Sequence, residues 1–326
     1  MGVPRVFIDG EAGTTGLQIY QRLARRDDLE VISIAPDKRK DASERARLLN
    51  AADVSILCLP DEAAREAVGW VTNPKAKILD ASTAHRTARD WIYGFAELTV
   101  MQRDRIAQAT RVSNPGCYPT GFLAAVAPLI TAGVLPADFP LTVNAISGYS
   151  GGGKKLIAQY ESLRAENLGE SLAPYSPYGL KFGHKHVKEM QQYAGLTHTP
   201  LFVPSVGDFA QGMLVQVPLP LWTLSGSSKA VPTGQQLHDT LSKHYADEPF
   251  VKVMPYQDAS QLRDGNFLEA KSANHTNEVQ LFVFANDHTQ EALLVARLDN
   301  LGKGASGAAV QNLNIMLALP EHTGLD

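Results

Sequence analysis

The stretch Arg5-Val6-Phe7-Ile8-Asp9-Gly10-Glu11-Ala12-Gly13-Thr14-Thr15-Gly16 decides the fold that we expect for this chain. Its first five residues have the character of a strand, three glycines follow at G-x-x-G-x-x-G spacing, and a helical pattern runs from 14 to 24. Such a turn brings the backbone close to a pyrophosphate and presents helix N–H groups to its charge. The commonest dinucleotide fingerprint is G-x-G-x-x-G, and a turn that only packs a helix on a sheet would look similar. The position after the first strand favours a nucleotide, and the residues predicted to contact it are Gly10, Gly13, Thr14, Thr15 and Gly16.

The first 117 residues alternate short apolar strands with helical patterns. The expected strands are 5–9, 30–35, 54–59, 77–80 and 111–113, and the expected helices are 14–24, 43–49, 61–71 and 99–108. Strands separated by helices of this length predict a parallel sheet with helices on both faces, which is a Rossmann-like α/β domain. Such sheets bind ligands beyond the carboxyl ends of their strands.

After about residue 135 the pattern changes to strands with few helices between them. These strands are expected at 139–146, 201–203, 212–217, 250–253, 278–284 and 292–297. This pattern predicts a mixed or antiparallel sheet in a second, α+β domain. Residues 224–233 are expected to form a loop, and the chain ends with a helical pattern over 305–319.

Length and composition restrict the class of protein. With 326 residues, two domains or one elaborated domain are expected. A net charge of −4 gives no electrostatic reason to expect nucleic acid or an anionic membrane as a partner. No apolar stretch reaches the ~20 residues that a membrane span needs, and no signal peptide is expected. Two cysteines cannot form a disulfide framework, so a reducing, cytoplasmic location is expected.

A second decisive segment is Ser113-Asn114-Pro115-Gly116-Cys117-Tyr118-Pro119-Thr120. A strand stops at a Pro-Gly turn, and Pro119 opens a long apolar stretch, as proline does in a first helical turn. Cys117 is therefore expected just outside a helix N-terminus, where unpaired N–H groups stabilise a thiolate nucleophile. The alternative is a small buried cysteine at a strand end. Cys58, within an apolar strand pattern, is interpreted as a core residue.

The segment after the second strand bears on the choice of dinucleotide. A carboxylate there suits the ribose 2′-hydroxyl of NAD, whereas cations suit the 2′-phosphate of NADP. The segment contains Asp37, which is ambiguous, followed by Lys38, Arg39 and Lys40. The three cations favour NADP, although a solvated basic loop would have the same sequence.

A histidine cluster, Gly183-His184-Lys185-His186-Val187-Lys188-Glu189-Met190, offers an acid/base partner for a nucleophile. His186 and Glu189 share one face of a helix, where a carboxylate can orient an imidazole. His-x-His is also a spacing of metal ligands, but no further ligand cluster completes a site, so no metal is expected.

Two further segments are candidates for anion binding. The segment 148–155 carries glycines and two lysines after a strand, a composition that can cradle a phosphate, form a mobile lid or be an ordinary loop. Arg86 follows the fourth strand and could pair with a substrate carboxylate, although a surface arginine is the simpler interpretation.

Ser113–Thr120 resembles the active-site segment of the N-acetyl-γ-glutamyl-phosphate reductases, enzymes of arginine biosynthesis. The short chain resembles the compact, type 2 branch of that family. The resemblance extends over nearly the whole chain, through Gly10–Gly16, Asp80–Arg86, Ser147–Lys154, Gly183–His186 and Lys303–Asn312.

The resemblance implies NADPH-dependent reduction of an acyl phosphate through a thioester. Cys117 would be the nucleophile and His186 the acid/base. The residues implied to bind the substrate are Arg86, Asn114, Ser147, Gly148, Lys154 and His184.

The resemblance also implies an organisation into domains. Residues 1–117 with the C-terminal helix 303–326 would bind NADP(H), and 118–302 would form the catalytic and oligomerisation domain. Lys38 and Arg39 would assist the glycine turn, and Asn312 would lie near the nicotinamide. A homo-oligomer, either dimer or tetramer, is expected.

Two departures from the longer branch of the family concern Lys185, where an arginine is usual, and Ala84-His85-Arg86, where Asp-Phe-Arg is common. The second departure leaves the details of the substrate contacts open. The alternatives are an aspartate-semialdehyde dehydrogenase, a lysine-pathway reductase, a cysteine hydrolase or acyltransferase, and a non-catalytic NADP-binding sensor. The glycine turn and the basic segment argue against the hydrolase, because a hydrolase needs no dinucleotide.

Overall fold

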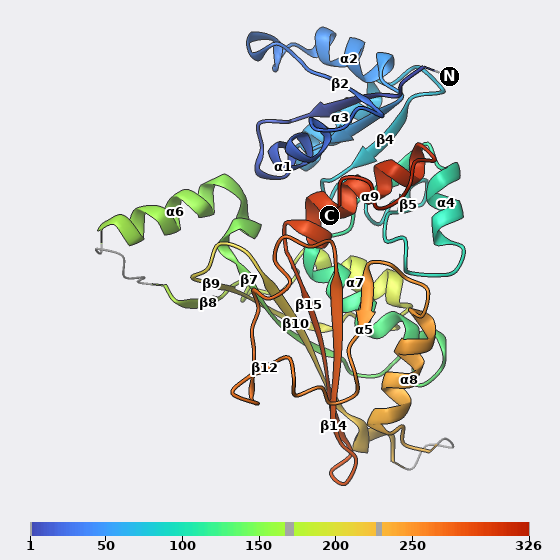
Figure 1. Ribbon diagram of the computed structural model, residues 1–326, viewed down its shortest axis with the longest axis vertical. Coiled ribbons are helices and arrows are strands. Elements are labelled where there is room, and N and C mark those ends of the chain that lie inside the picture. Colours follow the sequence, from blue (N-terminus) through green and yellow to red (C-terminus); the bar gives the residue numbers. More distant parts are fainter. Residues whose placement is uncertain (1, 167–172, 226–229, 326) are drawn as a thin grey trace. The chain divides into compact units, whose positions relative to one another are not determined.

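The computed structural model describes residues 2–166, 173–225 and 230–325 and divides the chain into two compact units (Figure 1). The first unit combines Met1–Gly116 with Ala305–Asp326, and the second is Cys117–Gly304. The first contains a parallel sheet and the second a mixed sheet, which confirms the predicted fold class.

The first unit is built on a six-stranded parallel sheet of order β2-β1-β3-β4-β6-β5. Its strands are β1 (Arg5–Asp9), β2 (Glu30–Ile32), β3 (Val54–Leu57), β4 (Lys77–Asp80), β5 (Ile92–Tyr93) and β6 (Arg111–Ser113). β2 ends three residues earlier than the prediction, at an edge of the sheet where a single neighbouring strand holds it. β5 was not predicted, because two residues are too few to show a periodic pattern.

Helices pack against the strands of this sheet, as expected for a Rossmann-like unit. Those of the first unit are α1 (Thr14–Leu23), η1 (Pro36–Lys38), α2 (Ala42–Ala51), α3 (Asp61–Gly69), α4 (Gln102–Gln108) and α9 (Gly307–Met316). The buried side chains of α2 and α3 join Phe7 and Ile78 in one apolar cluster. α1 is amphipathic and buries Ile19 and Leu23.

The C-terminal helix α9 belongs to the first unit through specific contacts. α9 contacts α1, α4 and β4, and all of its residues are buried. The Arg26 Nη1 donates to Asn314 Oδ1 at 2.6 Å, and the Lys77 Nζ donates to the Met316 carbonyl at 2.7 Å. Residues that are far apart in the sequence therefore complete one core.

The second unit is built on a seven-stranded mixed sheet of order β11-β14-β15-β10-β7-β9-β8. β7 pairs with β9, and β11 with β14, in parallel; the other described pairings are antiparallel. The strands are β7 (Thr142–Gly148), β8 (Tyr175–Pro177), β9 (Leu201–Gly207), β10 (Met213–Pro220), β11 (Val251–Val253), β14 (Val279–Asn286) and β15 (Glu291–Leu298), with a small hairpin of β12 (Leu262–Arg263) and β13 (Phe267–Leu268).

The second unit contains more helix than the sequence predicted. Its helices are α5 (Cys117–Thr131), α6 (Gly153–Glu166), α7 (His186–Ala194) and α8 (Gly234–His244), with 3₁₀ turns η2 (Tyr149–Gly152) and η3 (Leu221–Leu224). The segment 148–155 is thus η2 and the first turn of α6 rather than a loop. The predicted loop 224–233 includes 226–229, which lie outside the described residues. No helix in the described ranges is long and apolar enough to cross a membrane.

α5 is the central helix of the second unit and lies against β10, β14 and β15. Its internal Pro128 has no N–H, so the carbonyl of Ala124 loses its helical partner. The Tyr245 hydroxyl donates to that carbonyl at 2.9 Å and replaces the missing bond. Gly121 lets α5 approach the sheet closely, because a Cβ there would lie 2.9 Å from Val215 Cγ2.

We predict that Gly121→Val lowers the free energy of unfolding by about 1–3 kcal/mol, because the new side chain overpacks the contact between α5 and the sheet. Gly69→Ala in α3 is the control, because a Cβ there has no neighbour within 4 Å. The control should leave stability unchanged or raise it by up to about 1 kcal/mol. Urea unfolding followed by circular dichroism measures both, and equal effects would contradict the packing argument.

Candidate active site

The glycine turn between β1 and α1 is tight enough to exclude side chains. Gly10 has φ +91°, and a Cβ on it would lie 2.4 Å from the Cys58 carbonyl oxygen. A Cβ on Gly16 would lie 2.4 Å from the Gly10 carbonyl oxygen, whereas Gly13 is less crowded. Gly13 caps α1 without a side-chain hydrogen bond, and the first turn of α1 contains no acidic residue. The N–H groups at this helix start are therefore suited to an anion.

The two predicted basic contacts, Lys38 at the end of η1 and Arg39 directly after it, interact with different carboxylates. The Arg39 Nη2 donates to Glu11 Oε1 in the glycine turn at 2.8 Å. Lys38 is exposed, and its charge acts on Glu44 at the start of α2. Arg39 is thus held at the glycine turn, and Lys38 lies close enough to α2 to lower the pKa of the Glu44 carboxyl, after the larger effect of Arg47.

The structure brings Asn114 and Asn312 together within the first unit, although 198 positions separate them. The Asn312 Nδ2 donates to the Gly94 carbonyl at 2.7 Å and to Asn114 Oδ1 at 3.1 Å. The Asn312 Oδ1 is buried and has no hydrogen-bond partner among the described residues. An amide N–H of a ligand would satisfy this acceptor.

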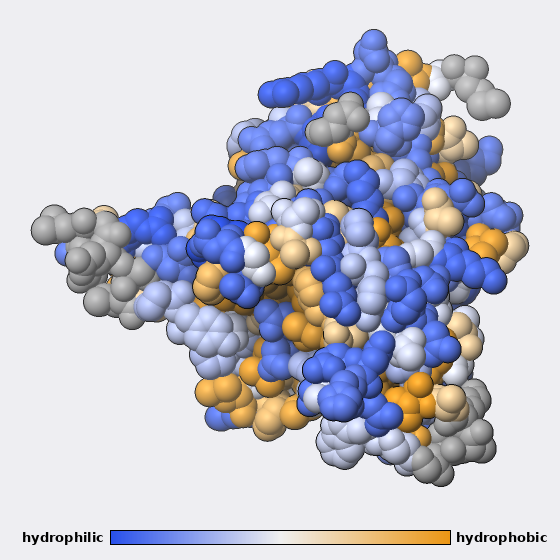
Figure 2. All heavy atoms as spheres, turned by 60° about the horizontal axis from the view of Figure 1, so that its bottom comes forward, coloured by the Kyte–Doolittle hydropathy of each residue, from blue (hydrophilic) through white to orange (hydrophobic). Residues whose placement is uncertain are grey.

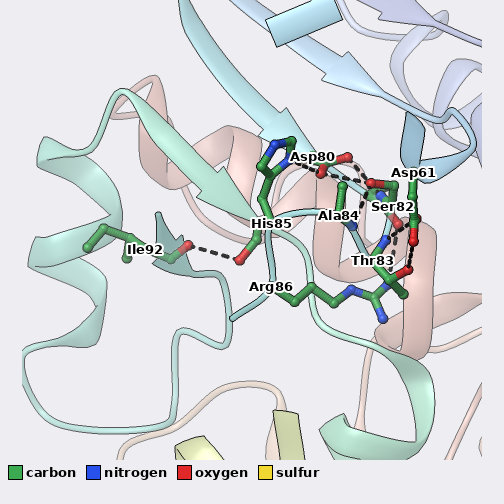
Figure 3. Close-up of polar contacts among 10 residues, drawn as sticks. Asp61, Asp80, Ser82, Thr83, Ala84, His85, Arg86 and Ile92 are labelled. Atoms are coloured by element: carbon green, nitrogen blue, oxygen red, sulfur yellow. Dashed lines mark hydrogen bonds and ion pairs between the residues drawn. The ribbon is translucent and has the colours of Figure 1, made fainter. Parts of the chain in front are cut away.

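The loop after β4 is stabilised by two carboxylates (Figure 3). Asp80 accepts from the N–H and the hydroxyl of Ser82, both at 2.8 Å, and lies 2.6 Å from His85 Nδ1. Asp61 accepts from the N–H and the hydroxyl of Thr83. These contacts were not predicted from the sequence, although an aspartate followed two residues later by serine is a common local turn signal.

The same loop carries Arg86. The side chain is largely buried, and its Nη2 donates to the Ala81 carbonyl at 3.3 Å. His85 stacks on Trp91 with ring centroids 4.1 Å apart, which fixes the residue preceding Arg86. Arg86 is therefore a held guanidinium rather than a mobile surface arginine.

Cys117 is the first residue of α5, so it lies in the first helical turn and not just outside it as predicted. It forms no disulfide and is partly exposed. A Cβ on Gly304 would lie 3.0 Å from the Cys117 Cβ, so Gly304 makes room for this residue. A first helical turn supplies the N–H groups and the positive dipole end that favour a thiolate.

An aromatic and imidazole cluster surrounds the residue after Cys117. The Tyr118 ring lies 5.9 Å from His186 and 6.4 Å from His184, measured between centroids. The two histidine rings are 4.7 Å apart, and Tyr178 lies 5.8 Å from His184. His186 begins α7 and is buried together with Glu189, so the predicted pair shares the inner face of the helix.

The hydrogen bonds of this cluster define its protonation. The His186 N–H donates to His184 Nδ1 at 3.2 Å, so His184 carries its ring proton on Nε2. Burial, with a smaller contribution from Lys185, lowers the pKa of His184. The pKa of Tyr118 is raised and that of Tyr178 is raised to about 12. Burial is the largest cause in both cases, and the neighbouring Cys117 contributes in the same direction. Both phenols therefore remain hydrogen-bond donors at neutral pH.

Ser147 and Gly148 end β7, and Lys154 is an exposed residue in the first turn of α6. Ser147 is buried and donates to the Gly148 carbonyl at 3.0 Å. The N–H groups of Gly148, Tyr149 and Ser150 donate to carbonyls of 209–212, so they are already used. An anion near this segment would have to bind further along, at the start of α6.

Cys58 directly follows β3, and its thiol is buried although the residue as a whole is partly exposed. Burial of the thiol, with smaller contributions from Asp80 and Asp9, raises the pKa of Cys58 to about 12. Among the described residues no cluster of three or more histidine, cysteine, aspartate or glutamate side chains could hold a metal.

We predict that Cys58 reacts with iodoacetamide at pH 8 on the order of 10³-fold more slowly than a free cysteine, because the thiolate is the reactive form. With the pKa raised to about 12, the rate should increase about tenfold for each pH unit between 8 and 11. Peptide mapping of the Cys117→Ala variant measures this rate without interference from the second thiol. Fast labelling at pH 7 would contradict the raised pKa.

Comparison with solved structures identifies the fold, and a family model identifies the class. Aspartate semialdehyde dehydrogenase II from Vibrio cholerae, complexed with ASA, matches with a TM-score of 0.75 at 15% identity, over 98% of this chain and 99% of that chain. Aspartate semialdehyde dehydrogenase with NADP from Candida albicans matches with a TM-score of 0.68 at 12% identity, over 97% and 99%. Residues 117–300 match the family model described as semialdehyde dehydrogenase, dimerisation domain.

Sequence relatives identify the family within that class. The N-acetyl-gamma-glutamyl-phosphate reductase 2 of Nostoc sp. is 64% identical over 326 residues and covers 100% of both chains. The N-acetyl-gamma-glutamyl-phosphate reductase of Mesorhizobium japonicum is 52% identical over 318 residues, 97% of this chain and 99% of its own. The chain belongs to the N-acetyl-γ-glutamyl-phosphate reductase family, as the resemblance of its motifs predicted.

Proposed function

We propose that the chain reduces N-acetyl-γ-glutamyl phosphate to N-acetylglutamate-γ-semialdehyde and phosphate, with NADPH as reductant, in arginine biosynthesis. The observation that carries this proposal is the placement of Cys117 in the first turn of α5, next to the cluster of Tyr118, His184 and His186. The full-length relatives at 64% and 52% identity favour this substrate over aspartate semialdehyde, whose enzymes match at 12–15% identity.

Cys117 supplies the nucleophile of the proposed reaction. The thiolate attacks the γ-acyl carbon, the C–O bond to phosphate breaks, and inorganic phosphate leaves with the bonding electrons. The acyl group then remains on the Cys117 sulfur as a thioester. Splitting the reaction in this way lowers each barrier, and the helix N-terminus favours the thiolate both before attack and after release.

His186 handles the proton. Reduction of the thioester carbonyl needs a proton on the oxygen, and collapse of the resulting thiohemiacetal returns that proton as the C–S bond breaks and the aldehyde leaves. A buried imidazole at the start of α7 is suited to both transfers. The neutral Nε2–H of His184 is a donor for the substrate, and Arg86, Asn114, Ser147, Gly148 and Lys154 are the other proposed substrate contacts.

The first unit fits a nicotinamide dinucleotide, which supplies the hydride when bound. Gly10 and Gly16 permit a tight turn in which a Cβ would clash with backbone carbonyls, and the first turn of α1 has no side-chain cap. Asn312 offers a buried acceptor for an amide. We assign NADP(H) rather than NAD(H) on the basis of Lys38 and Arg39. Thr14 and Thr15 begin α1, where they would approach the pyrophosphate.

We propose that residues 1–117 and 303–326 form the dinucleotide-binding domain and that residues 118–302 form the catalytic domain. We also propose a homo-oligomer, dimer or tetramer, in the cytoplasm. The name of the matching family model supports self-association. Large apolar side chains of the second unit remain exposed, including Leu201, Trp222 and Phe267, and Figure 2 shows hydrophobic side chains among hydrophilic ones on the surface.

The reverse reaction provides the test of the proposed function. Phosphate-dependent reduction of NADP⁺ by N-acetylglutamate-γ-semialdehyde is followed at the absorbance band of NADPH, with aspartate semialdehyde as the control substrate. Turnover confined to the acetylated substrate supports the proposal. Turnover of aspartate semialdehyde alone would retain the chemistry and replace the substrate.

Cys117→Ala should abolish turnover, because no other thiol of this chain is placed to form the thioester, while NADPH still binds. Steady-state rates and the fluorescence of bound NADPH measure the two properties. Cys117→Ser is a second variant that keeps a weaker nucleophile of similar size. Activity near that of the wild type in Cys117→Ala would remove the nucleophile from the mechanism.

His186→Asn should lower kcat by roughly 10²–10⁴-fold, the usual contribution of a positioned acid/base. His198→Asn is the matched control, because His198 is exposed beyond α7. The kcat of His198→Asn should equal that of the wild type. An equal loss in both variants, or none in His186→Asn, would contradict the assigned role.

A further inference from the structure

Glu11 and Arg39 form an ion pair across the proposed dinucleotide site. Glu11 follows Gly10 in the glycine turn after β1, and Arg39 follows η1 after β2. The Nη2–Oε1 distance is 2.8 Å, and the side chains are 16% exposed for Glu11 and 42% for Arg39. Because β1 and β2 are neighbours in the sheet, the pair spans the carboxyl ends of adjacent strands.

This position is where adenine dinucleotides are distinguished. A carboxylate there accepts from the 2′-hydroxyl of NADH, whereas a guanidinium binds the 2′-phosphate of NADPH through parallel N–H groups. In this chain a guanidinium of the segment after β2, Arg39, is bonded to a carboxylate of the neighbouring glycine turn, Glu11. Of the three consecutive cations, Arg39 is the one that reaches the glycine turn, since the charge of Lys38 acts on Glu44 instead.

We propose that Glu11 competes with the 2′-phosphate of NADPH for Arg39, so that the Glu11–Arg39 pair sets how strongly this chain prefers NADPH to NADH. The inference rests on the proposed function, because it takes the glycine turn as the dinucleotide site. Binding of the phosphate brings a second anion next to the Glu11 carboxylate, and the guanidinium has to be shared between two acceptors. Glu11 therefore weakens NADPH binding, and does so through Arg39.

The experiment measures dissociation constants of the free protein for NADPH, NADH and adenosine 2′,5′-bisphosphate by isothermal titration calorimetry. The variants are Glu11→Gln, Arg39→Ala and the double variant. Glu30→Gln is the control, because this substitution also removes one carboxylate charge. Glu30 begins β2, at the end of the strand opposite to the one that leads to Arg39, and its side chain is 60% exposed.

We expect Glu11→Gln to lower the dissociation constant for NADPH by about 3- to 5-fold, the scale of an exposed ion pair, and to leave that for NADH within twofold. Arg39→Ala should raise the constant for NADPH by roughly 10- to 100-fold, the value of hydrogen bonds to a charged group. In the Arg39→Ala background, Glu11→Gln should have no further effect. The dissociation constant for adenosine 2′,5′-bisphosphate should change in the same direction as that for NADPH. Glu30→Gln should bind all three ligands as tightly as the wild type does.

Weaker NADPH binding in Glu11→Gln would overturn the proposal, because Glu11 would then position Arg39 for the phosphate. An effect that is equal for NADH and NADPH, or that persists without Arg39, would overturn it as well. Failure of the wild-type protein to bind NADPH would instead contradict the proposed cofactor, so the two failures are distinguishable.

Discussion

The proposed chemistry depends on the close packing of Gly304 against Cys117 within the second unit. The chain passes between its two units twice, at Gly116–Cys117 and at Gly304–Ala305. Within the second unit, Gly304 lies against Cys117 so closely that a Cβ would be 3.0 Å from the Cys117 Cβ. Within the first, the Asn114 Nδ2 donates to the Ala305 carbonyl at 3.0 Å. Within the second unit, the nucleophile at the start of α5 is therefore packed against Gly304. A side chain at 304 would displace the start of α5, and with it the thiol.

Tyr118 connects the start of α5 to β9 and to the two histidines of the cluster. Its hydroxyl donates to the Ser205 carbonyl of β9 at 3.0 Å, which ties the first turn of α5 to the sheet. Its ring packs against Phe202 and both histidines, and the Tyr178 hydroxyl lies 3.4 Å from its own. Because burial keeps the phenol neutral, the bond to Ser205 persists across the pH range of catalysis. The distance between nucleophile and imidazoles is thus set by packing.

The sequence predicted those features that depend on local chemistry. The turn Gly10–Gly16 was recognisable because only glycine fits a backbone that folds this closely on itself. α6 was missed because three glycines precede it and only Tyr160 is buried, so neither propensity nor periodicity marks the helix. The Asn114–Asn312 contact and the Arg39–Glu11 pair join residues that are distant in the sequence. No spacing rule indicates such contacts, and only the folded sheet brings these side chains together.

The two histidines of the cluster differ in position, and this difference separates their roles. His184 accepts the backbone N–H of His186 at Nδ1, which fixes its proton on Nε2. Burial and Lys185 lower its pKa, so the ring becomes charged only at a lower pH than an ordinary imidazole. Such a ring is a constant hydrogen-bond donor and a poor proton carrier. Neither ring nitrogen of His186 takes part in this hydrogen bond, because His186 donates through its backbone N–H. Proton transfer in the proposed reaction is therefore left to His186, and substrate binding to His184.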